Sequence, residues 1–120
     1  MSFPVTVQFL GLDASDALHA KIDEYAQRLS KFADDIRSCR VVISVDRHPH
    51  HKGDRYRVNI HLSVGGQEIQ AGDSHATDPR HEDPYVAVAD AFHVARRCVE
   101  DYARRHRAAT RPARGAANPT

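Results

Sequence analysis

Hydrophobic and polar residues alternate with a period of two in four segments of the chain, the pattern of half-buried β-strands. The four segments are residues 3–10, 39–47, 55–64 and 67–72. The third is the clearest, because its alternate residues are Tyr56, Val58, Ile60, Leu62 and Val64. Gly65-Gly66 separates the last two segments and predicts a tight hairpin turn. The pattern therefore predicts a mostly antiparallel sheet with one face exposed to solvent.

Two further segments have apolar residues at helical spacing. Ser15 is a candidate N-cap for a helix that ends near Ala33, and Asp83-Pro84 is a typical start for a helix that ends near Arg107. The predicted order is β-α-β-β-β-α. Two helices most simply cover one face of a four-stranded sheet, which is an α+β two-layer sandwich. The expected core includes Val58, Ile60, Leu62, Val88, Phe92 and Val99.

The opposite sheet face is expected to be polar. It would present Arg40, Arg55, Arg57, Asn59, His61 and Gln70. Such a face is also what any solvated sheet presents, so it indicates a binding site only weakly. We expect residues 1–107 to form one domain, and residues 108–120, rich in Ala, Pro and Arg, to be disordered.

The composition is that of a soluble domain. The chain has 120 residues, of which 41% are hydrophobic, enough to form one core without disulfides or a metal. No apolar run approaches the roughly 18 residues that a membrane span requires, and the N-terminus lacks the pattern of a secretory signal. We therefore expect a cytoplasmic protein without a membrane partner. Cys39 and Cys98 lie within apolar patterns and are expected to be small buried residues.

Sequence signatures of catalysis are missing from the chain. It contains no G-x-x-x-x-G-K-[ST], G-x-G-x-x-G or G-x-S-x-G motif. Its carboxylates are scattered over helix surfaces and loops. We therefore expect a protein that is not an enzyme and that takes no small-molecule substrate or cofactor.

Histidines are frequent, and three of the nine, His48, His50 and His51, lie within four residues. Grouped imidazoles, with His61 on the next strand, could bind zinc or copper. A loop is a poor ligand cage, however, and no Cys or acidic pair completes a known spacing. We expect surface histidines without a metal. A metal- or pH-responsive protein and a contact with RNA remain alternative interpretations.

Charge is distributed unevenly along the chain. Residues 1–90 hold 10 basic and 14 acidic residues, a net charge of −4, whereas residues 91–120 hold 7 arginines and 2 acids, a net charge of +5. Arg97 and Arg104 are seven residues apart and share a helix face, flanked by Arg96 and Arg105. The planar guanidinium can donate two hydrogen bonds to one phosphate, which favours an RNA-binding helix.

The alternative is that these arginines only keep a long helix soluble. The i,i+4 pairs for this interpretation would be Arg96–Glu100, Arg97–Asp101 and Asp101–Arg105. These three pairs share only two acids, so several arginines would stay unpaired. We favour the RNA-binding interpretation.

The last predicted helix, DPYVAVADAFHVARRCVEDY, resembles that of the ribosome hibernation-promoting factor and ribosome-associated inhibitor A family, also called sigma-54 modulation proteins. That helix opens in the family with an acid, an apolar residue and Tyr-Ala-Ala-Ile, which residues 83–88 match except at Pro84 and Val86. Arg97 lies where the family usually has Arg, and Ala17-Leu18, Arg28, Leu29 and Lys31 match its first helix. The resemblance covers residues 3–107 and is to a short, divergent form.

The resemblance implies the β-α-β-β-β-α fold and a factor without enzymatic activity. Such a factor binds rRNA of the small ribosomal subunit near the decoding centre, blocks mRNA and tRNA, and inhibits translation under stress. The expected RNA-binding residues on the helices are Arg28, Lys31, Arg96, Arg97, Arg104 and Arg105, and those on the open sheet face are Arg55, Arg57 and His61.

The chain departs from the family pattern in its cations. Tyr25 stands where the first helix of the family usually has Lys, and His93 and Val94 bring no fixed positive charge. The dimerisation domain of the long family members is not in the sequence, so the resemblance does not imply ribosome pairing. A metal- or pH-responsive protein centred on the histidines and an adaptor that docks a protein partner are the competing hypotheses.

Overall fold

The elements follow one another in the predicted order in the residues that the computed structural model describes, 3–46, 55–72 and 82–110. They are β1 (Val5–Leu10), α1 (Asp16–Arg28), the short 3-10 helix η1 (Leu29–Lys31), β2 (Ile36–Asp46), β3 (Arg55–Val64), β4 (Gln67–Gly72) and α2 (Pro84–Thr110). The β-α-β-β-β-α prediction is therefore confirmed.

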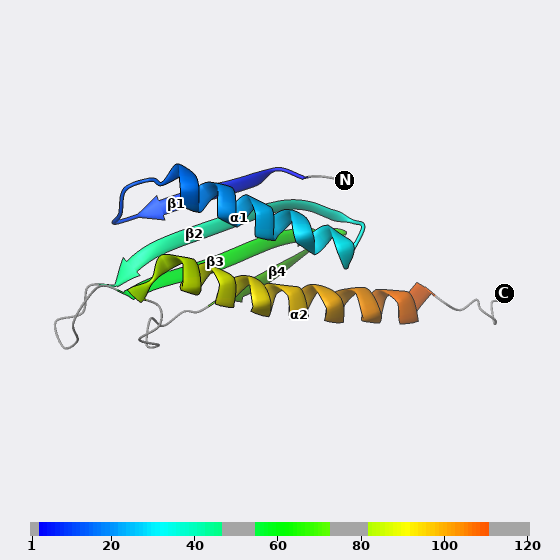
Figure 1. Cartoon of the computed structure of the whole chain (residues 1–120). Helices are drawn as coiled ribbons and strands as arrows, with labels where there is room; N and C mark the ends of the chain where they lie inside the picture. The colour runs from blue at the N-terminus through cyan, green and yellow to red at the C-terminus, as the bar shows by residue number, and fades with distance from the viewer. Residues whose placement is uncertain (1–2, 47–54, 73–81, 111–120) are drawn as a thin grey trace.

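The four strands form one sheet in the order β1-β2-β3-β4. Strand β1 runs parallel to β2, because α1 crosses over between them, and the other two pairs are antiparallel. Across β2 and β3 the register pairs Val41 with Ile60 and Ile43 with Val58, which places four branched side chains on one face. The sheet is mixed, with mostly antiparallel pairs (Figure 1).

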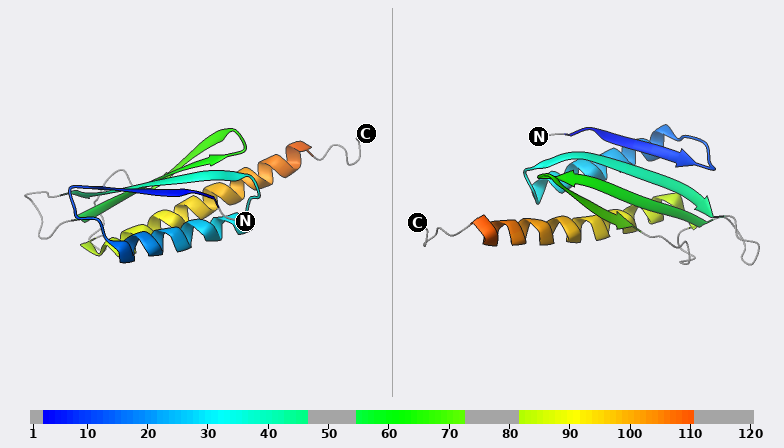
Figure 2. Two further views of the ribbon diagram at one scale, coloured as in Figure 1. Left: turned by 90° about the horizontal axis from the view of Figure 1, so that it is seen from above. Right: turned by 180° about the vertical axis from the view of Figure 1, so that it is seen from behind.

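Both helices lie on the same face of the sheet, as the left view of Figure 2 shows. Helix α1 packs on β1, α2 packs on β3 and β4, and the two helices contact each other. The prediction of a two-layer α+β sandwich is confirmed. The last turns of α2 extend beyond the ends of the strands (Figure 1).

The core fills the space between the sheet and the helices. All six residues predicted for it are buried: Val58, Ile60, Leu62, Val88, Phe92 and Val99. Each buried side chain of this size stabilises the fold by about 1.5–3 kcal/mol relative to an exposed one. Strand β1 shows the predicted alternation, with Val5, Val7 and Phe9 half-buried and the residues between them exposed.

The helix starts are as predicted, whereas the ends differ by a few residues. The Oγ of Ser15 accepts a hydrogen bond from the Leu18 N–H at 3.2 Å and caps α1. The regular helix ends at Arg28 and continues as η1 to Lys31, two residues short of the predicted end. Helix α2 continues to Thr110, three residues past its predicted end. The predicted tail beyond Thr110 lies outside the described residues.

Strand β2 starts at Ile36, three residues before its predicted start. The register with β3 shifts between Ile36 and Ser38. This irregularity breaks the period of two there, which is why the alternation predicts only the part from Cys39 onward.

Asp35, which directly precedes β2, connects α2 to the β3–β4 hairpin by hydrogen bonds to both. The Tyr102 hydroxyl donates a hydrogen bond of 2.8 Å to Asp35 Oδ2, and the Gly65 N–H donates to the Asp35 carbonyl at 3.0 Å. Gly65 has a φ of +52°, and a Cβ there would collide with the Tyr102 hydroxyl and the Asp35 carboxylate. Glycine is therefore required for both its backbone conformation and its small size.

Neither cysteine is in a disulfide, and Cys39 is buried whereas Cys98 is half-buried. Burial raises the pKa of the Cys39 thiol to about 12. Among the described residues, no helix has the length and apolar character that crossing a membrane requires.

Candidate nucleic-acid interface

The candidate RNA-binding residues fall into two groups on different layers of the sandwich. The helical group is Arg28, Lys31, Arg96, Arg97, Arg104 and Arg105, and all six are exposed. The sheet group is Arg55, Arg57 and His61, which lie on β3 and are half-buried. Because the helices cover one face of the sheet and these β3 residues alternate with the buried ones, the two groups face opposite sides of the domain.

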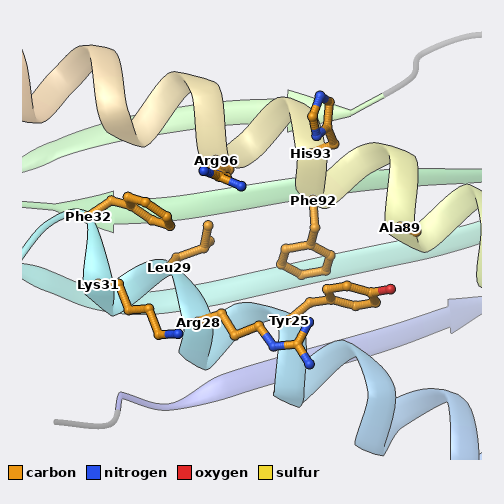
Figure 3. Close-up of a pocket in the computed structure, with 9 residues that line it drawn as sticks. All are labelled: Tyr25, Arg28, Leu29, Lys31, Phe32, Ala89, Phe92, His93 and Arg96. Carbon is orange, nitrogen blue, oxygen red and sulfur yellow. The ribbon is translucent and has the colours of Figure 1, made fainter.

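Four of the six residues of the helical group lie around a groove between α1 and α2, which we call the interhelical groove. One hollow in it has a volume of about 260 Å³, and Figure 3 shows the side chains around it. Three of its lining residues, Arg28, Lys31 and Arg96, carry a fixed positive charge, and no carboxylate lines it. The lining residues are Tyr25, Arg28, Leu29, Lys31, Phe32, Ala89, Phe92, His93 and Arg96. This part of the groove is suited to an anionic partner.

The groove continues toward the C-terminal end of α2. Lys31 and Phe32 also line the next hollow, where Arg104, Glu100 and Ala103 stand opposite them. Four cations from the predicted helical group thus lie along one groove. Arg97 and Arg105 are exposed on α2 but do not line these hollows.

The floor of the groove is aromatic. The rings of Tyr25 and Phe92 stack with their centroids 5.6 Å apart and an angle of 16° between their planes. Phe92 is buried, whereas Tyr25 and Phe32 are half-buried at the edge of the core. Helical spacing alone assigns these rings to the apolar stripes, so sequence reasoning missed them as part of the site. One sequence signal could have indicated their role: Arg28 follows Tyr25 by three residues, which places a cation beside the ring on the same helix face.

Arg28 and Arg96 are positioned by ion pairs and by aromatic rings. The Arg28 guanidinium pairs with Glu24 and lies 5.3 Å from the centroid of Tyr25. The Arg96 Nε lies 3.4 Å from Glu100, and its guanidinium lies 4.8 Å from the centroid of Phe32. Cation–π contacts at exposed sites contribute about 0.5–1 kcal/mol each. They orient the guanidinium groups over the groove.

The ion pairs farther along α2 differ in part from the prediction. Arg96–Glu100 and Asp101–Arg105 form, but Asp101 takes Arg104 as its second partner. Arg97 has no ion-pair partner within the described part of the chain, so the Arg97–Asp101 pair considered in the solubility interpretation does not form. Asp101 has two oxygens, and both are occupied by arginines that lie closer to the C-terminus. The hydrogen bond from Arg104 and the charge of Arg105 lower the pKa of Asp101.

Of the sheet group, His61 belongs to a polar row that crosses the open face, and Arg57 and Arg55 lie farther along β3, opposite Ser44 and Asp46. The register aligns Thr6, Arg40, His61 and Gln70 across all four strands. His61 and Gln70 also line a shallow hollow of about 210 Å³ with Asn59 and Gly72. The predicted polar face is therefore present, but it has no aromatic floor comparable to that of the groove.

The predicted histidine cluster at His48, His50 and His51 lies outside the described residues. Within the described residues, no group of three or more potential ligands could hold a metal ion. That these histidines hold no metal stays a prediction.

Two helices on one face of a four-stranded sheet, with a cationic groove between them, define a small α+β protein with a positively charged helical surface. The sequence profile of the Sigma 54 modulation protein / S30EA ribosomal protein family matches residues 5–107. The chain belongs to this ribosome-associated family, so the resemblance seen in the sequence is confirmed.

Two solved structures share the fold. A ribosomal subunit interface protein from Coxiella burnetii superposes with a TM-score of 0.61 at 17% sequence identity, over 83% of this chain and 97% of the other. The N-terminal domain of Protein Y from Thermus thermophilus superposes with a TM-score of 0.56, also at 17% identity, over 85% of this chain and 99% of the other. A search of curated proteins found no match.

Proposed function

We propose that this chain is a factor without enzymatic activity that binds rRNA of the small ribosomal subunit. It acts in the cytoplasm, binds near the decoding centre and inhibits translation under stress by blocking mRNA and tRNA. Membership of a ribosome-associated family supports the partner. The observation that carries the proposal is the convergence of Arg28, Lys31, Arg96 and Arg104 on one groove.

The groove has the chemistry that an RNA backbone requires. Guanidinium groups donate paired hydrogen bonds to phosphate oxygens, and each neutralised phosphate releases counterions. The carboxylate partners of Arg28 and Arg96 are exposed, and exposed ion pairs contribute about 0–1 kcal/mol. Replacing such a carboxylate with a phosphate therefore costs little.

The sheet group would be a second contact and not the first. Arg55, Arg57 and His61 lie on the opposite side from the groove, so one RNA segment cannot reach both groups at once. A site between two segments of rRNA would use both.

Sedimentation with purified small and large subunits, at low and high salt, tests this function. We expect the protein to pellet with small subunits at low salt and to be released as salt rises. With four phosphate contacts the logarithm of the binding constant should fall with the logarithm of salt concentration with a slope of about −3 to −4. Binding to neither subunit would contradict the proposal.

Charge reversal on the helix tests which surface binds. The double variant Arg97→Glu/Arg104→Glu changes two exposed residues on one face of α2, one of which lines the groove. Its affinity for small subunits should fall at least tenfold, about 1.4 kcal/mol, with a shallower salt dependence. Arg37→Glu/Arg40→Glu makes the same charge change on exposed residues of β2 and should weaken binding less than the helix variant, since the open sheet face is only the second contact. The reverse result would move the contact to the sheet.

A further inference from the structure

The hollow of about 260 Å³ in the interhelical groove has a property that phosphate binding does not use. Its charged rim surrounds three aromatic rings, Tyr25, Phe32 and Phe92. A site for phosphates alone needs only the cations, because a phosphate gains little from an aromatic floor. The rings therefore point to a partner that has a flat apolar surface as well as a negative charge.

Figure 3 shows how these side chains are arranged. The Tyr25 and Phe92 rings lie side by side at one end of the hollow, Phe32 lies at the other end, and Leu29 lies between them. Arg28 and Lys31 extend along the α1 side, and Arg96 comes from α2. The guanidinium of Arg96 lies over Phe32, so flat groups are available at the rim as well as on the floor.

We propose that this hollow holds an unpaired segment of an RNA strand, with one base against Tyr25 at one end, a second base against Phe32 at the other, and its phosphates on Arg28, Lys31 and Arg96. Nucleobases stack on aromatic rings and on guanidinium planes, and unpaired bases are the ones whose faces are free to do so. A base within a duplex is covered by its neighbours and cannot lie against these rings. The inference rests on the proposed function and adds that the RNA is unpaired where it meets the groove.

Charge complementarity selects this occupant over a protein segment. Three fixed cations and no carboxylate line the hollow, so an uncharged apolar helix would take these charges, with the exposed ion pairs of Arg28 and Arg96, out of water without adding a new partner, which is costly. An acidic peptide would match the charge but would leave the rings without a stacking partner.

The test uses a short single-stranded adenine oligoribonucleotide that carries one 2-aminopurine. Binding is followed by fluorescence anisotropy, and stacking by quenching of the 2-aminopurine emission. The competing probes are the same strand in a duplex, a ribose-phosphate strand without bases, and oligoglutamate. The wild-type protein should quench the probe and should bind the single strand roughly tenfold more tightly than the strand without bases.

Two variants, Tyr25→Leu and Phe32→Leu, remove one ring each and keep an apolar side chain of similar size. Each should weaken binding of the single strand by roughly tenfold and restore emission, with little effect on the strand without bases. Tyr85→Leu is the matched control, since Tyr85 is an aromatic residue of α2 that is 42% exposed and lies outside the groove. If Tyr25→Leu fails to fold, Phe32→Leu, which leaves the Tyr25–Phe92 stack intact, provides the same test.

The outcomes separate this inference from the proposed function. Equal binding of strands with and without bases, without quenching, overturns the stacked nucleotide while sedimentation with small subunits can still succeed. Equal binding of oligoglutamate or of the duplex also overturns it. Quenching of the oligonucleotide without any sedimentation with small subunits supports the nucleotide site and overturns the proposed function.

Discussion

Phe92 connects the core to the interhelical groove, and its replacement by alanine tests both. The side chain is 4% exposed, and its ring stacks on Tyr25. Removal of a buried phenylalanine ring costs about 3–5 kcal/mol, because apolar contacts are lost and a cavity remains. The stack with Tyr25 accounts for about 0.5–1.5 kcal/mol of this. We expect Phe92→Ala to lower the free energy of unfolding by about 4 kcal/mol.

Urea unfolding followed by far-ultraviolet circular dichroism measures this loss, since the chain has no tryptophan. A domain of this size is stable by about 5–15 kcal/mol, so Phe92→Ala leaves little reserve. Phe92→Leu keeps most of the side-chain volume and should lower the free energy of unfolding by less than about 1.5 kcal/mol. This variant therefore stays folded enough for its unfolding to be measured. A double-mutant cycle with Tyr25→Leu should give a coupling energy of about 1 kcal/mol.

Tyr85→Ala provides the control, because Tyr85 is on the same helix but is exposed. Its stability should stay within about 0.5 kcal/mol of the wild type. A loss below about 1 kcal/mol for Phe92→Ala, or a loss equal to that of Tyr85→Ala, would refute the placement of Phe92 between the helices and the sheet.

Three further predictions follow from the hairpin contact and the buried thiol. Gly65→Ala should destabilise the fold by about 1–3 kcal/mol in the same urea assay, because φ is +52° and Asp35 is close; wild-type stability would show that the turn adapts. Tyr102→Phe should cost about 1 kcal/mol at neutral pH through the lost hydrogen bond. Burial raises the pKa of the Tyr102 hydroxyl above its usual value, so the stability from this hydrogen bond is lost as pH rises through the folded-state pKa. The difference in free energy of unfolding between wild type and Tyr102→Phe should therefore narrow in alkali, and a difference that stays constant with pH would contradict this. Cys39, with a pKa of about 12, should resist iodoacetamide in the native protein while Cys98 reacts, and equal labelling would show that Cys39 is accessible.

The strands were predictable because their signal is local. In β3 every second residue from Val58 to Val64 is buried, and one sequence is enough to see that alternation. The signal fails where pairing is irregular, as between Ile36 and Ser38. The ends of α1 and α2 depend on packing and capping beyond the apolar stripe, which is why both differ from the prediction.

The groove was predictable only in part, because it depends on how far apart two helices lie. Arg28, Lys31, Arg96 and Arg104 could be chosen from the sequence by type and by helix face. That Tyr25 and Phe32 remain at the edge of the core follows from the separation of α1 and α2, which no local pattern encodes. The partners of Asp101 were missed in part for a similar reason, since side-chain reach and not spacing decides between Arg97 and Arg104.

The central claim is that the interhelical groove faces rRNA of the small subunit. The most direct measurement places a diazirine photo-crosslinker at Lys31, in the groove, or at Arg40, on the open sheet face, and irradiates each protein bound to small subunits. We predict crosslinks to small-subunit rRNA from position 31, and fewer from position 40, which lies on the second contact. Crosslinks to rRNA from position 40 alone, or from position 31 only to ribosomal proteins, would contradict the account.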